Sequence, residues 1–448
     1  MAGFNISGLA SGLDTTSIIS QLMQLERQPQ TLLRTKLTDT KADASAYRTV
    51  NSTVSTLQSA AEKLTQAATW TPVKASSSHT SVSASASAGA ATGQISFSVT
   101  TLAASHTVID NSTWSDPTSD VTLTVTDADG DTAAKDITIT AGSTLDQAVT
   151  TINAAKAGVT ATAVNTGAGF RLQLTSTASG LDGKFTTSGG ITFGAVTDGT
   201  DAQLSVAGGA YTATSATNTF SDLMPGTTFT VSEKGATATV TVASDPAALA
   251  SAVQAMVDAA NTVLTTINER ANNSPGSTAV LRGDSSLRAL AGQLVDAVTH
   301  AVGADGTLLT ADAASKAGIT VERDGKLKFD SAKFTALLTE DPALARRLVD
   351  GDTSGTTAVP GVAQRLLTLA KSATDATTGS LVTLANGKDS EVSDIQKRID
   401  AWDQRLELRQ QTLTRQFTAL ESALSSLQSQ SSWLSGQLAS LPGWSSSS

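Results

Sequence analysis

The segment Asp127–Asp131, of sequence Asp-Ala-Asp-Gly-Asp, comes nearest in this chain to a chemical site. Alternating carboxylates are the ligands that calcium prefers, so the segment faintly resembles a calcium-binding loop. Such a loop needs a bidentate glutamate at its twelfth position and a glycine at its sixth. The twelfth position here is Thr138, and Gly130 stands at the fourth. We therefore predict a tight turn between two strands, without calcium.

Other residue types that carry chemistry are too scattered to build a site. Gly167-Ala-Gly169 could begin a dinucleotide-binding fingerprint, but Leu172 takes the place of the third glycine and a strand is expected next. The histidines, His79, His106 and His300, lie far apart, without an acidic or histidine neighbour at ligand spacing, and the chain has no cysteine. The chain also lacks the Gly-x-Ser-x-Gly elbow of serine hydrolases. We expect no catalytic residues, no metal, no cofactor and no enzymatic activity, which favours a structural or binding role.

The composition excludes some partners. The chain has 448 residues, a net charge of −10, 40% hydrophobic and only 16% charged residues. Between residues 71 and 247 there are 14 acidic and 6 basic side chains, which accounts for −8 of that charge. An acidic middle argues against nucleic acid and anionic membranes as partners. No apolar run approaches the roughly 18 residues of a membrane span, and the first residues do not form an ordinary secretory signal, so composition alone indicates a cytoplasmic protein.

The elements that organise the chain are its two ends. Between Glu391 and Leu441 apolar residues recur at alternating gaps of three and four, a 3.5-residue period that predicts a long helix seeking partner helices. Residues Ile18 to Leu64 repeat the pattern, interrupted at Pro29 and preceded by Asp14 or Thr15 as the helix cap. We predict that the two ends meet as an antiparallel pair, within a larger bundle or alone.

Charge is absent where an exposed helix would normally carry it. Residues 422–441 contain no Asp, Glu, Lys or Arg, and Asp14 is the one charged side chain before Glu26. Small uncharged polar groups cost less to desolvate than ions, so these faces suit helices packed on several sides. The alternative is a poorly ordered serine-rich tail. Under the first interpretation the terminal helices associate with other helices, and the residues expected to make that contact are Ile18, Leu22, Leu25, Leu424, Leu427, Trp433, Leu434 and Leu438.

The middle of the chain changes to a two-residue period. Strand patterns run from Ile95 to Val242, with a short helix at 144–155, and helical patterns return at 249–267, 287–298, 334–349 and 362–373. Residues 75–93 are either a linker or a sparse edge strand, and 319–329 form a hairpin around Asp324-Gly325. The predicted fold class is therefore α+β and multidomain, with β-rich domains inserted between terminal heptad helices that form a coiled coil or helical bundle. The expected divisions are 1–45 and 391–448 as coiled-coil segments, 46–70 and 246–390 as a helical domain, 71–107 and 201–245 as a β-rich domain, and 108–200 as a β-rich insert.

Several motifs together resemble those of one family, the flagellar filament cap proteins called hook-associated protein 2. The opening matches in Asn5-Ile-Ser-Gly-Leu-Ala-Ser-Gly-Leu-Asp14, Thr16-Ser-Ile-Ile-Ser-Gln-Leu22 and Glu26-Arg-Gln-Pro29, and the end in Arg415-Gln-Phe417, Ala419-Leu-Glu421, Ser429-Gln430 and Trp433-Leu434. In between, residues 145–175 resemble a repeat of flagellin-like inserts. Residues 222–226, 281–284 and 318–330 resemble the C-terminal region of the family.

The resemblance implies a cap at the distal tip of the bacterial flagellum that helps arriving flagellin subunits to fold and insert and prevents their leakage. It implies secretion through the flagellar type III channel without a cleaved signal peptide, which the absence of cysteine also suits. The implied partners are further copies of the chain in a ring, flagellin, the hook-filament junction proteins and an export chaperone. Two alternatives remain at this point: an adhesin whose β-rich domains bind host glycans, and a flagellin-like filament subunit.

Overall fold

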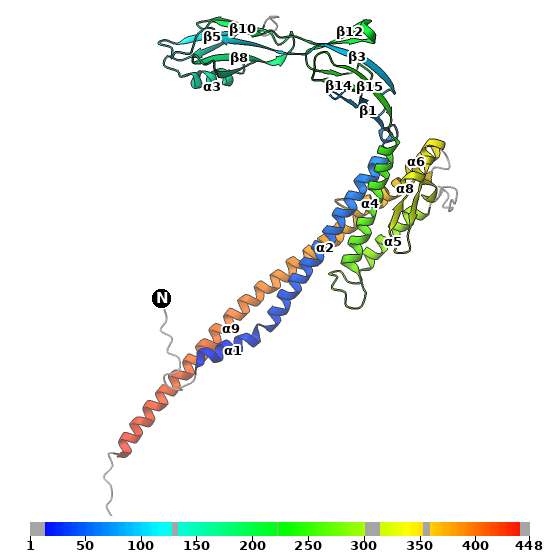
Figure 1. Cartoon of the computed structure of the whole chain (residues 1–448). Coiled ribbons are helices and arrows are strands. Elements are labelled where there is room, and N and C mark those ends of the chain that lie inside the picture. Colours follow the sequence, from blue (N-terminus) through cyan, green and yellow to red (C-terminus); the bar gives the residue numbers. More distant parts are fainter. Residues whose placement is uncertain (1–13, 128–132, 222, 301–313, 353–358, 440–448) are drawn as a thin grey trace, which may run out of the picture. The chain divides into compact units, whose positions relative to one another are not determined.

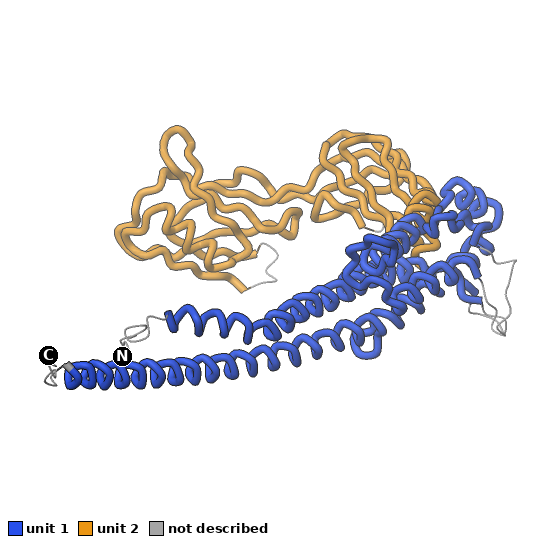
Figure 2. The backbone as a smooth tube through the Cα atoms, turned by 90° about the horizontal axis from the view of Figure 1, so that it is seen from below, with its two compact units in different colours: residues 1–65, 253–448 blue, residues 66–252 orange. Residues whose placement is uncertain are grey.

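The structure is a computed structural model that describes residues 14–127, 133–221, 223–300, 314–352 and 359–439. The chain divides into two compact units (Figure 2), one formed by residues 1–65 with 253–448 and the other by residues 66–252. Most of the turn predicted at Asp127–Asp131 lies outside the described residues.

Three helices form the long part of the first unit. Helix α1 (Thr15–Glu26) begins at Asp14, whose side chain accepts the amide of Ser17, and α2 (Gln28–Leu64) follows after a break at Arg27. Pro29 stands in the first turn of α2, where its missing N–H costs no hydrogen bond. Helix α9 (Ser380–Ala439) runs without interruption for 60 residues beside both of them (Figure 1). The predicted pairing of the two chain ends is thus confirmed, and helix rather than irregular chain continues to Ala439.

The remainder of the first unit is a small α/β assembly. It contains α4 (Pro246–Ala271) from residue 253 onward and α5 (Ser285–Thr299). After them come the hairpin β16 (Ile319–Val321) with β17 (Leu327–Phe329), α6 (Ser331–Glu340), α7 (Pro342–Val349), the two-residue strands β18 (Gly351–Asp352) and β19 (Val359–Pro360), and α8 (Val362–Thr374). Asn261 of α4 holds the hairpin by bonding the amide and the carbonyl of Leu327 through its side-chain amide. Helix α8 packs on α2, α5 and α9.

One predicted helix is broken in the structure. The apolar pattern at 334–349 predicts a single helix, but α6 ends at Glu340 and α7 starts at Pro342. Asp341 between them has φ −142° and ψ 85°, because a residue before proline is disfavoured in the helical region. Its side chain then caps α7 by accepting the amide of Leu344.

The second unit contains two β lobes, each with its own core. The first lobe packs the five-stranded sheet β1-β15-β3-β11-β12 against the three-stranded sheet β13-β14-β2. Its core includes the stacked rings of Phe97 and Phe229, 5.9 Å apart. Its strands are β1 (Val73–Ser77), β2 (Val82–Ala86), β3 (Gly93–Thr101), β11 (Ala202–Val206), β12 (Tyr211–Ser215), β13 (Thr219–Ser221), β14 (Thr227–Val231) and β15 (Thr237–Ser244). Residues 75–93, predicted as linker or strand, thus contribute two strands.

The second lobe lies between β3 and β11 in the sequence. It has the sheets β10-β4-β8-β7 and β6-β5-β9, together with α3 (Leu145–Ala155). A capping box of Thr144 and Gln147 starts α3, and Ile152 on its inner face is fully buried. The strands are β4 (Ser105–Asp110), β5 (Val121–Asp127), β6 (Lys135–Ile139), β7 (Val159–Asn165), β8 (Phe170–Ser179), β9 (Phe185–Gly189) and β10 (Phe193–Thr197).

Helix α4 is, within the described ranges, the one helix whose length and composition would allow it to cross a membrane. Its apolar residues Val253, Met256, Val257, Ala260 and Val263 are buried inside the protein, which is the pattern of a core helix.

Candidate assembly site on the terminal helices

The site begins with the apolar seam between the two chain ends. One cluster joins Leu33 of α2 to Ile395 and Ile399 of α9, and a second joins Met23 of α1 to Leu406 and Leu413. Trp402 packs against both clusters, and the Arg405 guanidinium lies 4.9 Å from its ring centre. Residue numbers fall along one helix as they rise along the other, so the pair is antiparallel.

Ion pairs follow the same seam along its edges. Each joins α1 or α2 to α9, and the first four pairs named here run in the antiparallel order. The pairs are Glu26 with Arg409, Arg34 with Asp403, Lys36 with Glu391, Asp43 with Lys388, and Arg48 with Asp389. Exposed pairs contribute about 0–1 kcal/mol each, so their main effect is to select the register rather than to hold the helices together.

Lys388 and Glu391 connect two of these pairs. The Lys388 Nζ lies 2.9 Å from Asp43 and 3.6 Å from Glu391, and Lys36 lies 2.9 Å from Glu391 on its other side. The hydrogen bond from Lys36, followed by the attraction of Lys36 and Lys388, lowers the pKa of the Glu391 carboxyl. The hydrogen bond to Asp43, opposed by partial burial, raises the pKa of Lys388. Both groups are therefore held in their charged forms.

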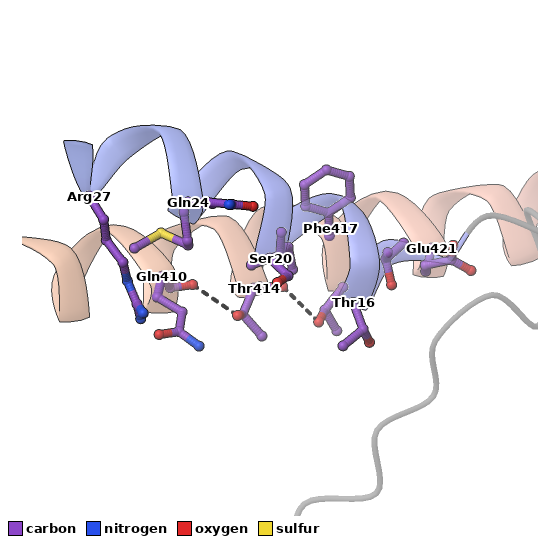
Figure 3. A pocket seen from close by; sticks show the side chains of 12 residues that line it. Thr16, Ser20, Gln24, Arg27, Gln410, Thr414, Phe417 and Glu421 are labelled. Carbon is purple, nitrogen blue, oxygen red and sulfur yellow. Dashed lines mark hydrogen bonds between the residues drawn. The ribbon is translucent and has the colours of Figure 1, made fainter. Parts of the chain in front are cut away.

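A groove of about 490 Å³ runs between α1 and α9 along both sides of Met23 (Figure 3). Thr16, Ser20 and Gln24 of α1 line it opposite Gln410 and Thr414 of α9. The hydroxyls of Thr414 and Thr418 donate to carbonyls of their own helix, of Gln410 and Thr414 respectively, and so do not join α9 to α1. Thr15 of α1 and Glu421 of α9, at the far end of the groove, are both buried.

Past Glu421, α9 extends beyond the first described residues of α1 (Figures 1 and 2). We call residues Ser422–Leu438 the α9 tail; at 1.5 Å per residue it is about 25 Å long. It carries no charged side chain, and its large apolar groups face solvent, with Leu427 60%, Trp433 64% and Leu438 63% exposed. An apolar stripe of this size is normally covered by a partner.

The predicted contact residues fall on different surfaces. Leu424 is half-buried, and Leu427, Trp433, Leu434 and Leu438 are exposed on the α9 tail. The sequence predicts that Ile18, Leu22 and Leu25 begin the stripe that pairs with the other chain end, and this part of the prediction is wrong. Ile19 and Met23 face α9 instead, while Leu22 and Leu25 are exposed on the outside of α1.

Sequence reasoning missed Ile19 and Met23 because α1 has apolar residues on more than one face. The signal that could have found them is the register of α1 against α9. If Glu26 is matched with Arg409, the residues one and two turns before it, Met23 and Ile19, fall on the inner face.

The three histidines that were considered as possible metal ligands lie in separate surroundings. His79 bonds Ser81, His106 lies edge-on to Phe185 at 4.9 Å with its Nδ1 3.8 Å from Asp198, and His300 lies beside Thr299 and Asp296. Across the part of the chain that the structure describes, no three His, Asp or Glu side chains are grouped so that they could hold a metal ion.

Comparison with known proteins gives matches along the chain. Residues 199–429 match the family model for the C-terminus of flagellar hook-associated protein 2, and residues 11–106 match the model for its N-terminus. Residues 120–178, in the second β lobe, match the flagellin hook IN motif.

Individual relatives agree with these family matches. The flagellar hook-associated protein 2 of Escherichia coli K12 is 28% identical, and the A-type protein of Pseudomonas aeruginosa is 27% identical, each over 98% of both chains. The crystal structure of domains D1-D2-D3 of the flagellar cap protein FliD from Escherichia coli covers 77% of this chain and 99% of its own, with 28% identity and a TM-score of 0.58. These matches favour a cap over an adhesin or a filament subunit. The chain belongs to the flagellar hook-associated protein 2 family, whose members cap the flagellar filament.

Proposed function

We propose that this protein is the structural cap at the distal tip of a bacterial flagellar filament, where it promotes the folding and insertion of exported flagellin subunits and prevents their loss. It would reach that position through the flagellar export channel, with an export chaperone, and would act as a ring of several copies placed on flagellin and the junction proteins.

The observation that carries the proposal is the α9 tail. This helical segment exposes Leu427, Trp433 and Leu438 to solvent and carries no charged side chain. Such a surface is stabilised when another molecule covers it. Burial of one such side chain contributes about 1.5–3 kcal/mol, so covering the stripe as a whole by other chains would represent a large gain. We infer that Leu424, Leu427, Trp433, Leu434 and Leu438 on the tail, with Ile18, Leu22 and Leu25 on α1, are the contact residues of assembly.

The uncharged surface of the α9 tail suits a cap that must move as the filament grows. Each added subunit displaces the end of the filament, so contacts there have to be released and made again. A contact made through the apolar residues of the tail contains no ion pair that would have to be broken at each step.

Deletion of residues 422–448 tests the proposal. We expect both units to fold, filaments to be absent or short, and flagellin monomers to appear in the culture medium. A sharper variant keeps the helix and places charge on the stripe by Leu427→Glu with Leu434→Glu. Its control, Ser422→Glu with Ser429→Glu, adds the same charge to the opposite face of the tail. Normal filaments from the deletion or from the leucine variant would refute the proposal, and equal defects in both double variants would show that charge alone, not the stripe, was responsible.

A further inference from the structure

The two β lobes of the second unit are connected by two chain segments, residues 102–104 from β3 to β4 and residues 198–201 from β10 to β11. These connections are bonded to each other. The amide of Ala104 donates to the carbonyl of Thr200 at 2.9 Å, and the amide of Thr200 donates to the carbonyl of Ala104 at 3.1 Å. Two paired strands are only marginally stable in water by themselves, so this short ladder alone would leave the second lobe free to rotate against the first.

The first lobe holds the outgoing connection through Asn218, which lies in the turn between β12 and β13. The side-chain Oδ1 of Asn218 accepts the amide of Ala103 at 2.8 Å, and its Nδ2 donates to the carbonyl of Ala103 at 3.2 Å. The hydroxyl of Thr101 donates to the carbonyl of Asp201 at 3.0 Å and so ties the start of one connection to the end of the other. Both connections are therefore fixed to the first lobe.

The end of β8 makes a further contact, between the second lobe and residues at the edge of the first. The hydroxyl of Ser179 donates to the carbonyl of Ala216 at 2.8 Å, and the amide of Leu181 donates to the Oδ1 of Asp201 at 2.7 Å. Ser179 and Leu181 belong to the second lobe, whereas Ala216 follows β12 and Asp201 directly precedes β11. A contact beside the two connections restrains the rotation that they would otherwise allow.

Gly180, between the two donors, brings the backbones of the lobes together. It has φ +88°, a conformation that favours glycine. An added Cβ would lie 2.6 Å from the Oδ1 of Asp201 and 2.7 Å from the Cα of Ala216. The lobes thus approach each other here through main chain rather than through long side chains, which could change their rotamers. The separation of the lobes at this point is consequently fixed by the backbone.

We propose that residues 179–181, Asp201 and Ala216 form a brace that holds the two β lobes as one rigid plate, with Asp201 as its positioning residue. Hydrogen bonds to a carboxylate are about twice as strong as those between neutral groups, so the bond from Leu181 to Asp201 is the main one of the brace. The consequence for assembly rests on the proposed cap function. A rigid plate would keep arriving subunits enclosed at the filament tip, whereas lobes that rotate freely would let them escape.

Distances between spin labels on the two lobes test the proposal in the full chain, which has no natural cysteine. The labels are attached at Thr162→Cys and Thr212→Cys, exposed positions on β7 and β12, and electron paramagnetic resonance gives the distribution of distances between them. We expect one narrow distribution in the otherwise natural chain and an about two-fold broader one in Asp201→Ala. Asp201→Asn should keep the narrow distribution, because the amide oxygen of asparagine can still accept the amide of Leu181.

Hydrogen exchange at the amide of Leu181 reports the central bond directly. Loss of one hydrogen bond changes the equilibrium for local opening by about ten-fold, so exchange of this amide should accelerate by about that factor in Asp201→Ala and little in Asp201→Asn. Asp198→Ala is the matched control, since it makes the same change in the same connection at a side chain that is 70% exposed. It should leave the exchange of Leu181 unchanged.

Gly180→Ala supplies a second variant, which should broaden the distribution by crowding the brace. Its control is Gly158→Ala in the same lobe, where φ is +75° and nothing lies within 4 Å of an added Cβ, so that it introduces backbone strain alone. A broad distribution in the natural chain, equal broadening by Asp201→Ala and Asp201→Asn, or equal broadening by the two glycine variants overturns the proposal. None of these results affects the cap function, which the deletion of residues 422–448 tests separately.

Discussion

Tyr47 of α2 donates its hydroxyl to the Oδ2 of Asp284 at 2.5 Å, while the Oδ1 of the same carboxylate accepts the amide of Leu287 and caps α5. One aspartate thus ties the long helix to the start of another helix more than two hundred residues away in sequence. Burial, followed by the bond to Asp284, raises the pKa of Tyr47 well above its ordinary value.

Replacing Tyr47 by Phe should destabilise the first unit by about 1–3 kcal/mol, because it leaves one buried carboxylate oxygen without its donor. Since the pKa of the folded tyrosine is raised, its contribution is complete below the ordinary value of about 10 and is lost as the pH rises above it. Urea unfolding at pH 8 and at pH 11 checks this. Tyr47→Phe should lower the midpoint at pH 8, and the difference from the natural chain should shrink at pH 11. A constant difference would contradict the assignment.

Met23→Ala should release α1 from α9 locally. Truncation of a buried methionine costs about 2–5 kcal/mol, and α1 has only one small apolar cluster to hold it. We expect hydrogen exchange of the α1 amides to accelerate by about 30-fold or more, corresponding to about 2 kcal/mol, with little change in the unfolding of the rest of the chain. Leu25→Ala, on the exposed face two residues away, is the matched control and should stay within about 0.5 kcal/mol in a dilute monomer. Equal acceleration in both variants would mean that α1 packs on α9 through a different face.

Glu391→Gln should make the helix pair less sensitive to acid. Because the folded pKa of Glu391 is lowered, its stabilisation is present above the ordinary glutamate value and disappears as the pH falls through the lowered pKa. The variant should be less stable at pH 7 by at most about 1 kcal/mol and equal to the natural chain near pH 2. Glu340→Gln, an exposed position at the end of α6, serves as the control. The measurement is thermal unfolding across this pH range, and a difference that grows toward acid would contradict the ion-pair geometry.

Gly189→Ala should disrupt the β5–β9 edge of the second β lobe. Gly189 has φ +115°, and a Cβ there would lie 2.1 Å from the Thr122 carbonyl oxygen, so a strand has to move. Gly142→Ala is the matched control, with φ +77° and nothing within 4 Å of its added Cβ. We expect about 1–2 kcal/mol of backbone strain for Gly142→Ala and a clearly larger loss for Gly189→Ala, measured as thermal unfolding of the full chain. Similar losses would mean that the strand edge yields easily.

The terminal pairing was predictable because a heptad period marks a helix that needs a partner, and the chain has such a period at both ends. The face of α1 was not predictable from period alone, since Ile18, Leu22 and Leu25 are as apolar as Ile19 and Met23. Which set faces inward depends on register with α9, and that register rests on contacts such as Glu26 with Arg409 between residues almost four hundred positions apart. The proposed contact role of the sequence-derived residues stays a prediction.

The β lobes show the same limit in another form. Alternation located most strands, including the β5–β6 hairpin, and the short helix α3 was predicted as well. The pairing of β1 with β15 did not follow, because Val73 and Ser244 meet only after the whole second lobe has been inserted between them. The proposed division into seven segments stays a prediction for the same reason.

The uninterrupted course of α9 has a mechanical consequence. Helix α9 runs from the folded body of the first unit to Ala439 and contains no proline. The helical chain that packs beside it is broken at Arg27, between α1 and α2. A force applied at the C-terminal end of α9 would therefore be transmitted along the helix, and bending of the helix pair would take place at the break between α1 and α2. A growing polymer could push against such a support without pulling apart the body that carries it.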